Sequence, residues 1–276
     1  MKTRNVTIDH IRVGRNAPLV LIAGPCVIEN YEATFETALF LKQLTDRLDI
    51  PFIFKASYDK ANRSSLRSFR GPGLTEGIRI LSDIKNELNV PVLSDVHEIH
   101  EISVAARVLD VIQVPAFLCR QTDFIIEAAK TGKPLNIKKG QFLAPWDIVN
   151  VAEKALSTGN DQLMITERGA MFGYNNLVVD FRGVKIIQDM GLPVIFDATH
   201  SVQLPGGQGS CSGGQREFVP TLAQAAVGAG VNGVFMEVHK NPAAALCDGP
   251  NSLELDNLET LAVRLIRLHT ALSREP

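Results

Sequence analysis

Eight short apolar runs, separated by longer amphipathic stretches, constrain the fold of this 276-residue chain more than any other feature. The runs are continuous in Val, Ile, Leu and Phe, which is typical of parallel strands that are buried on both faces. Proline or glycine precedes several of them, as expected where a strand begins. The expected strands are PLVLIAG (18–24), PFIFKAS (51–57), PVLSDVH (91–97), DVIQVPA (110–116), PLNIKKG (134–140), QLMITER (162–168), PVIFDAT (193–199) and GVFMEVH (233–239).

The segments between these runs repeat their apolar residues with the helical period, and Asp147 stands where a capping residue would start one of them. Eight strands that are each followed by a helix predict a closed (β/α)₈ barrel, the TIM-barrel fold, as a single domain over residues 1–276. An open, doubly wound α/β sheet is the alternative, but no GxGxxG follows the first run. The clearest expected helices are 31–48, 76–88, 146–156 and 255–272.

Two segments stand outside this repeat. The opening stretch NVTIDHIRVG alternates like two very short strands, and we expect a β-hairpin that caps the N-terminal mouth of the barrel. The stretch SVQLPGGQGSCSGGQREF (201–218) carries five glycines and is too polar for a core. We interpret it as a mobile lid over an active site, the alternative being a disordered surface loop without a role.

Composition narrows the function classes. The net charge is −2, which does not favour nucleic acid or an anionic membrane as the main partner, and no run approaches the length of a membrane span. The four cysteines are widely spaced and include no CxxC pair, which argues against a disulfide framework and against a structural zinc site. We therefore expect a soluble, cytoplasmic protein with reduced thiols.

Polar side chains gather where the apolar runs end. A charge inside an apolar strand is costly unless it is paired or faces a site, and barrels of this kind carry their active sites at the carboxyl ends of the strands. The sequence therefore predicts a polar active site at that end of the barrel. The strand-end residues are Cys26, Lys55, Lys60, Asp95, Gln113, Lys138, Arg168, Asp197, His200 and Glu237.

The cations of this set favour anionic substrates. Arginine suits bidentate contacts to phosphate and carboxylate groups, and lysine supplies a compact charge. KASYDKANRSS (55–65) concentrates two lysines, an arginine and serines directly after a strand, which favours a binding loop over a solvated basic loop. The expected cationic group is Lys55, Lys60, Arg63, Lys138 and Arg168.

A second set indicates a metal site. Cys26, His200 and Glu237 end the first, seventh and eighth runs, which become neighbours when a barrel closes, and Asp248 lies on the loop after the eighth. A thiolate, an imidazole and two carboxylates suit a divalent transition ion such as Zn²⁺, Fe²⁺ or Mn²⁺. Other residues near strand ends leave the choice open, whereas two further cysteines are interpreted as bystanders. The former are His97, His239 and Cys119; the latter are Cys211 and Cys247.

Long contiguous motifs carry a family resemblance over essentially the whole chain. They are FKASYDKANRSS, FRGPG, PAFLCRQTD, NIKKGQF, TERGAMFGYNNLVVD, FDATHSVQLPGG and HKNPAAALCDGP. The sequence resembles the 3-deoxy-D-manno-octulosonate 8-phosphate synthase family. This resemblance implies a homotetrameric barrel that condenses phosphoenolpyruvate with D-arabinose 5-phosphate and water, releases phosphate and serves lipopolysaccharide inner-core synthesis.

The resemblance also implies residue roles. Lys60, Lys138 and Arg168 would bind phosphoenolpyruvate, with Lys55 and Gln113 lining the same pocket. The sugar phosphate would be held across a subunit boundary by Asn62, Arg63 and Ser64, and Asp95 would contact the sugar hydroxyls.

The family has metal-free members, with asparagine at the position of Cys26, and metal-dependent members with cysteine there. Cys26, His200, Glu237 and Asp248 match the metal-dependent class. Lys138, Asp95, His200 and Cys26 are accordingly the expected catalytic residues.

Three rival functions remain open on the sequence. The sister enzyme, 3-deoxy-D-arabino-heptulosonate 7-phosphate synthase, uses erythrose 4-phosphate, but its loop resembles KPRTS rather than KANRSS. Lys138 as a Schiff-base lysine would make the chain a class I aldolase. A catalytically inactive binding barrel is the third rival, and the full set of strand-end charges argues against it.

Overall fold

The computed structural model describes residues 4–63, 65–207 and 212–273, and within them eight parallel strands form the predicted closed barrel. Each strand lies inside its expected run, because the run residues are buried on both faces. The strands are β3 (Val20–Gly24), β4 (Phe52–Lys55), β5 (Val92–Asp95), β6 (Val111–Val114), β7 (Leu135–Lys138), β8 (Leu163–Glu167), β11 (Val194–Asp197) and β14 (Gly233–His239). They pair in this order, and β14 pairs with both β11 and β3, which closes the ring.

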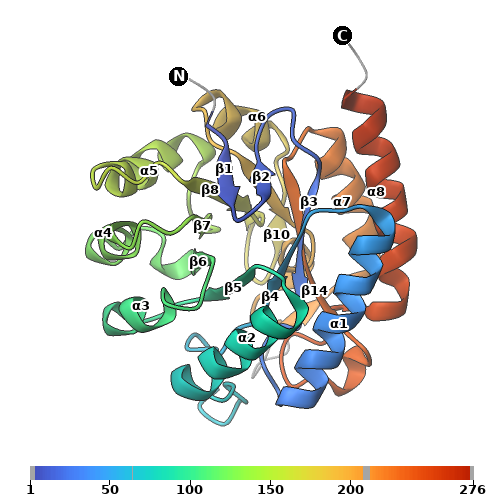
Figure 1. Ribbon diagram of the computed structural model, residues 1–276. Coiled ribbons are helices and arrows are strands. Elements are labelled where there is room, and N and C mark those ends of the chain that lie inside the picture. Colours follow the sequence, from blue (N-terminus) through green and yellow to red (C-terminus); the bar gives the residue numbers. More distant parts are fainter. Residues whose placement is uncertain (1–3, 64, 208–211, 274–276) are drawn as a thin grey trace.

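A helix follows every strand, and the helices surround the barrel (Figure 1). The first begins where Asn30 accepts a hydrogen bond from the backbone of Ala33 at 2.8 Å. Asp147 occupies the predicted cap position directly before the helix that starts at Ile148, but it belongs to a 3₁₀ turn and its side chain makes no capping bond. The helices are α1 (Tyr31–Leu48), α2 (Leu74–Leu88), α3 (Ile99–Ala105), α4 (Thr122–Lys130), α5 (Ile148–Leu156), α6 (Arg182–Asp189), α7 (Val219–Gly228) and α8 (Leu258–Ser273).

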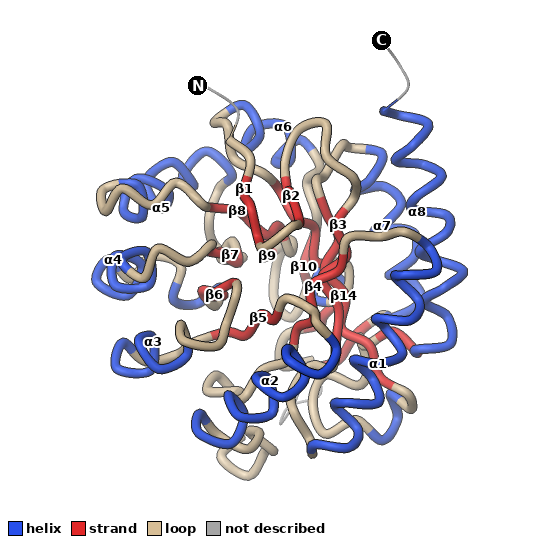
Figure 2. The backbone as a smooth tube through the Cα atoms, in the orientation of Figure 1, coloured by secondary structure: helices blue, strands red, loops and turns tan. Residues whose placement is uncertain are grey.

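The N-terminal half of the barrel interior is apolar and closed. The predicted hairpin is present as the antiparallel strands β1 (Val6–Ile8) and β2 (Ile11–Val13), and it lies across the barrel mouth (Figures 1 and 2). Its apolar side chains pack with inward side chains of the strands in one buried cluster. This cluster is Val6, Ile8, Ile11, Val13, Val20, Ile22, Ile53, Leu93, Val111, Met164, Ile195 and Phe235.

The C-terminal half of the same interior is polar. Side chains alternate along a strand, so a residue two positions after an inward apolar residue also points inward. At those positions the sequence changes from Ile, Leu, Val, Met and Phe to charged, amide and hydroxyl residues, all of them buried. The resulting layer is Lys55, Asp95, Gln113, Thr166, Asp197 and Glu237, joined on β7 by Asn136 and Lys138.

Short two-residue strands lie in the loops at the carboxyl end of the barrel. The loop expected to form a lid contains β12 (Gln203–Leu204), which pairs with β13 (Gly213–Gly214), but residues 208–211 lie outside the described part of the chain. Lid motion therefore stays a prediction. The remaining pairs involve β9 (Ala170–Met171), β10 (Leu177–Val178) and β15 (Leu253–Glu254).

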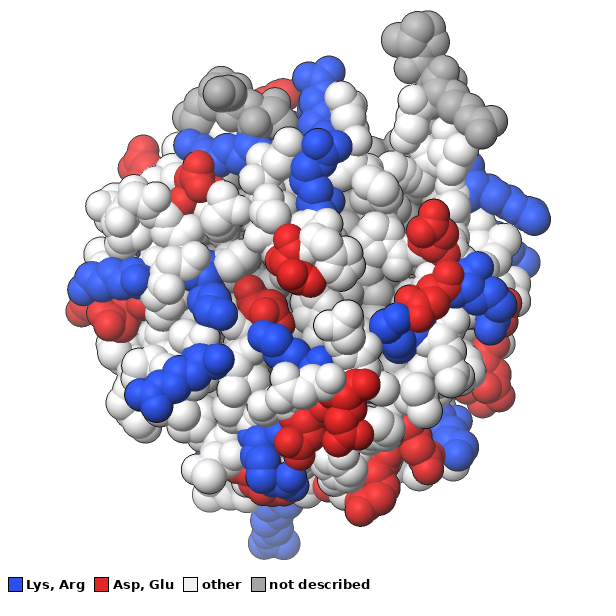
Figure 3. All heavy atoms as spheres, in the orientation of Figure 1, with Lys and Arg blue, Asp and Glu red and all other residues white. Residues whose placement is uncertain are grey.

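Two properties of the described residues concern the surface. None of their helices combines the length and the hydropathy that crossing a bilayer requires. On the face shown in Figure 3, lysine and arginine side chains are interspersed with aspartate and glutamate rather than gathered by sign.

Candidate active site

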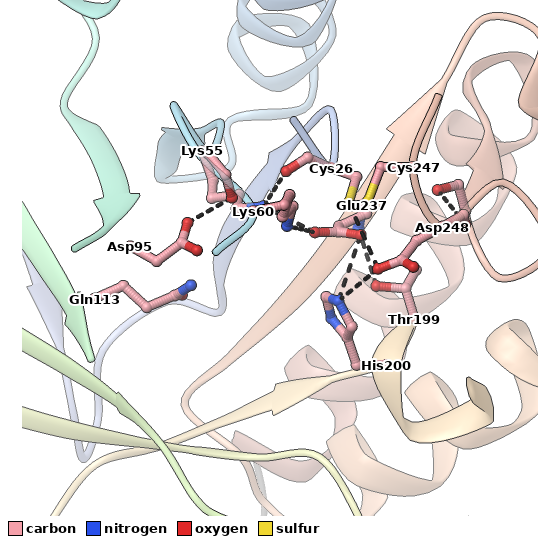
Figure 4. A network of polar contacts seen from close by, with 12 residues as sticks. Cys26, Lys55, Lys60, Asp95, Gln113, Thr199, His200, Glu237, Cys247 and Asp248 are labelled. Carbon is pink, nitrogen blue, oxygen red and sulfur yellow. Dashed lines mark hydrogen bonds and ion pairs between the residues drawn. The ribbon is translucent and has the colours of Figure 1, made fainter. Parts of the chain in front are cut away.

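Four side chains predicted to bind metal converge at the carboxyl end of the barrel (Figure 4). Nε2 of His200 lies 3.5 Å from Oε2 of Glu237 and 3.5 Å from Oδ2 of Asp248. Sγ of Cys26 lies 3.5 Å from the same Asp248 oxygen. Glu237 is on β14, Cys26 follows β3, and His200 begins the turn after β11, so the closure of the ring brings them together.

Cys247 is not a bystander. Its Sγ lies 3.0 Å from Sγ of Cys26 and accepts a hydrogen bond of 2.8 Å from Nη1 of Arg63. Cys26, Cys247 and Asp248 offer a second group of possible ligand atoms that overlaps the first. The loop after β14 folds back over the strand end, which places both Cys247 and Asp248 at the site.

His200 is oriented by Asp197. Its Nδ1 lies 2.7 Å from Oδ2 of Asp197, and its backbone N–H donates to Oδ1 at 2.9 Å. These contacts turn Nε2 toward Glu237 and Asp248, as second-layer carboxylates commonly do for ligand histidines. Burial lowers the pKa of His200, but the surrounding carboxylates outweigh it and raise that pKa to about 9.

The donor set fits a divalent transition ion. Oε2 of Glu237 is buried and has no hydrogen-bond partner among the described residues. It faces Nε2 of His200, so it is available to bind a metal ion together with that nitrogen. One imidazole, two carboxylates and two thiols match the ligand preferences of Zn²⁺ and Fe²⁺ better than those of Mg²⁺. Burial raises the pKa of the Cys26 thiol, so a metal ion must displace its proton on binding.

Lys55 and Lys60 flank Glu237 on its other side. Nζ of Lys55 donates to Oε1 of Glu237 and to the carbonyl of Cys26, both at 2.8 Å. Nζ of Lys60 lies 3.6 Å from the same carboxylate oxygen. Glu237 thus joins the cationic wall to the cluster of possible metal ligands, and Lys55 is fixed by two bonds.

Lys138 and Arg168 lie on the neighbouring strand ends. Lys138 forms an ion pair with Asp197, and its Nζ sits 3.2 Å from the centroid of the Phe235 ring. Burial lowers the pKa of Lys138 to about 8 against the attraction of Asp197. Nη2 of Arg168 donates to Oε1 of Gln203 at 3.0 Å, and burial lowers its pKa.

Asp95 and Gln113 form the far side of the polar layer. Asp95 accepts a hydrogen bond from Ser57 and lies 3.3 Å from Nε2 of His97. Burial raises the pKa of Asp95, but the lysines and His97 outweigh it and hold that pKa at about 2, so the side chain is a carboxylate. Gln113 accepts a hydrogen bond from Nδ2 of Asn136 at 3.0 Å.

The binding loop after β4 is split between the site and solvent. The contacts of Arg63 with Cys247 and Asp248 turn its guanidinium into the site of its own chain, 4.0 Å from Oδ1 of Asp248. Asn62 is exposed, and Ser64 lies outside the described residues.

The remaining candidate ligands lie elsewhere. His97 faces Asp95 and the carbonyl of Asp59, and His239 pairs with Glu29 at 3.5 Å. Cys119 is buried in the layer between strands and helices. The structure therefore gives no reason to prefer His97, His239 or Cys119 as metal ligands over Cys26, His200, Glu237 and Asp248.

The predicted cationic group carries counter-charges of its own. All five predicted cations reach the site, but Asp95, Asp197, Glu237 and Asp248 lie among them. Lys55 and Lys138 are already neutralised by partners, so the cations are not all free for substrate.

Sequence reasoning missed three residues at the site. Asp197 was recognised as a strand end but not as the partner of both Lys138 and His200. Asp197 stands two positions after Ile195 on the same strand, and this spacing could have indicated that its side chain points into the barrel. Cys247 and Gln203 stand on loops whose return path no periodicity reveals. Gln203 contacts Arg168 and, at 3.5 Å, Asp248.

Comparison with known proteins agrees with this geometry. The model of the DAHP synthetase I family matches residues 2–274. A protein of Desulfosudis oleivorans named 2-dehydro-3-deoxyphosphooctonate aldolase is 65% identical over 99% of this chain and 98% of its own length. Proteins with that name from Trichlorobacter lovleyi and Geobacter sulfurreducens are 59% and 58% identical over 95% of this chain and 97% of their own. The chain belongs to the DAHP synthetase I family, among the 2-dehydro-3-deoxyphosphooctonate aldolases.

Proposed function

We propose that the site condenses phosphoenolpyruvate with D-arabinose 5-phosphate and water, giving 3-deoxy-D-manno-octulosonate 8-phosphate and inorganic phosphate. The chain is then a transferase of lipopolysaccharide inner-core synthesis. The observation that carries the proposal is the adjacency of a buried cationic wall and a thiol, imidazole and carboxylate cluster at one barrel mouth. The names of the relatives favour this acceptor over erythrose 4-phosphate.

Phosphoenolpyruvate would bind deepest, against Lys60, Lys138 and Arg168. It carries about three negative charges at neutral pH, because the second pKa of a phosphate is near 6. Buried cations in a site of low dielectric bind such an anion strongly and hold its reacting carbon in place. Displacement of Asp197 from Lys138 would free that ammonium for the substrate.

The sugar would enter above it. Arg63 and the exposed Asn62 are suited to the phosphate at the rim, and the Asp95 carboxylate is suited to accept hydrogen bonds from sugar hydroxyls. This arrangement brings the aldehyde carbon of the sugar next to the enolate-like carbon of phosphoenolpyruvate, so that the new C–C bond forms between them.

Cys26, His200, Glu237 and Asp248 would hold a divalent ion, with Cys247 beside them. Such an ion would supply charge that orients the aldehyde oxygen or polarises it. The protein's own groups do the rest: Asp197 fixes the ring of His200, and Lys55 fixes Glu237 and the Cys26 backbone.

We also propose that the protein is a cytoplasmic homotetramer. Large apolar side chains follow three neighbouring strands, β6, β7 and β8, and are about half exposed or more. An apolar rim of this kind is typical of a contact between subunits. Its members are Phe117, Phe142, Trp146, Met171, Phe172 and Tyr174.

An assay of phosphate release tests the reaction. We expect rapid release from phosphoenolpyruvate with arabinose 5-phosphate and little with erythrose 4-phosphate. Equal or faster turnover with the four-carbon sugar would contradict the proposal and favour the sister reaction. Borohydride trapping of substrate on Lys138 would instead identify a class I aldolase.

Chelation tests the metal role. We expect activity to be lost on exhaustive chelation and restored by Zn²⁺, Fe²⁺ or Mn²⁺, and we expect Cys26→Ala to lose bound metal by elemental analysis. Cys26→Asn should retain some activity that no longer responds to chelator. Full activity of wild-type protein shown to be free of metal would overturn this role for Cys26.

A further inference from the structure

A buried ion pair lies outside the site, on the opposite face of two of its strands. Lys139 follows the last residue of β7 and Glu167 ends β8, and their side chains are 2% and 5% exposed. Nζ of Lys139 lies 3.4 Å from Oε2 of Glu167. The preceding outward residues of the same strands, Ile137 and Ile165, are apolar and paired in register.

Each partner also holds the turn that follows its own strand. Nζ of Lys139 donates to the carbonyl of Leu143 at 3.1 Å, and Oε1 of Glu167 accepts from the backbone N–H of Gly169 at 2.6 Å. The backbone N–H of Lys139 donates to the carbonyl of Thr166 at 2.8 Å. The pair thus joins two strand ends and the two loops that leave them.

The neighbours of the pair in sequence are two buried cations of the site. Lys138 precedes Lys139 and Arg168 follows Glu167, and alternation turns both toward the barrel interior. Any change in the spacing of the two strand ends therefore changes the separation of Lys138 and Arg168. A shift of about 1 Å in such groups is enough to weaken catalysis about 100-fold.

Stability does not explain the pair. Burying two charges costs several kcal/mol of desolvation, and apolar side chains of similar volume are often as stabilising as a buried ion pair or more so. The helix-facing layer around it is otherwise built from residues such as Leu135, Ile137 and Ile165. Directional bonds to defined backbone atoms are what this pair supplies and apolar packing does not.

We propose that Lys139 and Glu167 are positioning residues that set the spacing of Lys138 and Arg168 for the phosphoenolpyruvate anion. This inference rests on the proposed function of those two cations. It predicts that the pair governs the affinity for phosphoenolpyruvate and leaves the sugar unaffected, because the proposed sugar ligands lie on β5 and on the loop after β4.

The test is the double variant Lys139→Met/Glu167→Leu, checked for folding by circular dichroism and titrated with phosphoenolpyruvate by calorimetry. We expect the dissociation constant to rise about 10- to 100-fold. The Michaelis constant for arabinose 5-phosphate should not change. A merely structural pair would lower stability or the amount of active protein without this split between substrates.

The matched control is Ile137→Val/Ile165→Val, which alters the same layer of the same strands but no bond to a turn. It should bind phosphoenolpyruvate as the wild type does. If the double variant does not fold, Glu167→Gln is used instead, because it keeps an acceptor for Gly169 but removes the charge, and it should weaken phosphoenolpyruvate binding selectively.

Wild-type affinity for phosphoenolpyruvate in a folded variant that lacks the ion pair would overturn the inference. Arg168→Ala separates this failure from failure of the proposed function. If Arg168→Ala loses affinity while the pair variant does not, only the positioning role is wrong. If Arg168→Ala binds phosphoenolpyruvate normally, the proposed site and the positioning role are both wrong.

Discussion

The two halves of the barrel interior use the same strands for opposite purposes. Toward the N-terminal mouth, Ile53, Leu93 and Ile195 pack with the hairpin in a dry cluster. Two residues later on the same strands, Lys55, Asp95 and Asp197 form a charged layer that is equally buried. One half gains free energy from apolar burial, whereas the other must offset desolvation through ion pairs.

This difference teaches where substitutions should act. The apolar half anchors the strands, so changes there should affect stability and leave the chemistry intact. The polar half is held in place by that anchor, so changes there should affect binding and turnover while the fold survives. Four predictions test this division of roles.

The largest effect is expected for Arg168→Ala in the polar half. Loss of a buried cation that is proposed to contact the substrate anion should lower kcat/KM about 100- to 1,000-fold. Steady-state kinetics on folded protein measures this, with the far-ultraviolet dichroism spectrum as the control for folding. Near-normal turnover would mean that Arg168 serves only its contact with Gln203.

A stability effect without a kinetic one is expected for Ile195→Ala in the apolar half. Removing a fully buried side chain from this cluster should lower the free energy of unfolding by about 2–5 kcal/mol. Denaturant titration measures it, and kcat per folded molecule should stay at the wild-type value. A large fall in kcat would break the proposed separation of the two halves.

A pH effect is expected from Lys138. Its pKa in the folded protein is about 8, lowered by burial from the ordinary value of 10.5. The side chain therefore loses its charge at a lower pH in the folded protein than in the unfolded chain. The unfavourable contribution of this burial to stability is full below pH 8 and is relieved as the pH rises toward 10.5. Affinity for phosphoenolpyruvate should accordingly fall as the pH rises through 8.

Calorimetric titration of phosphoenolpyruvate between pH 7 and about 9.5 measures this fall, which spans the pKa of Lys138 near 8. Lys138→Arg is the matched variant, because a guanidinium stays charged across this range. Its affinity should fall much less with pH there, because the remaining titration in this range is that of His200, whose pKa is about 9. A fall of the same size in Lys138→Arg would assign the titration to another group.

The smallest effect is expected for Cys119→Ala. This thiol lies near a strand end but belongs to the layer between strands and helices. Metal content and kcat should match those of the wild type, whereas Cys26→Ala should lose both. Loss of metal in Cys119→Ala would contradict this, because it would mean that a cysteine near a strand end contributes to metal binding even when it does not face the barrel interior.

The sequence was sufficient for the barrel because each strand is a short run of large apolar residues between turn signals. It was also sufficient to predict that Cys26, His200 and Glu237 lie close together, since the closing of a ring makes β3, β11 and β14 neighbours. The boundaries shifted where local turns intervene, as in the 3₁₀ turn that delays α5 past Asp147.

The side-chain contacts inside the site could not be predicted from the sequence. Nothing in the spacing of Cys26 and Cys247, which are 221 residues apart, indicates that the two sulfur atoms lie 3.0 Å from each other. The same holds for the pairing of Lys138 on β7 with Asp197 on β11, two strands away. Such contacts depend on side-chain direction and loop return, which periodicity alone does not encode.

The hairpin at the N-terminal mouth affects the route by which substrates enter and products leave. Its packing closes the N-terminal end of the described barrel interior, so the substrates of the proposed reaction would enter, and its products would leave, at the carboxyl ends of the strands. Lys138 and Arg168 are buried at their strand ends, whereas Asn62 is exposed on the loop after β4. In the proposed reaction, a sugar phosphate bound by the exposed loop would block access to these cations, so phosphoenolpyruvate would bind before the sugar.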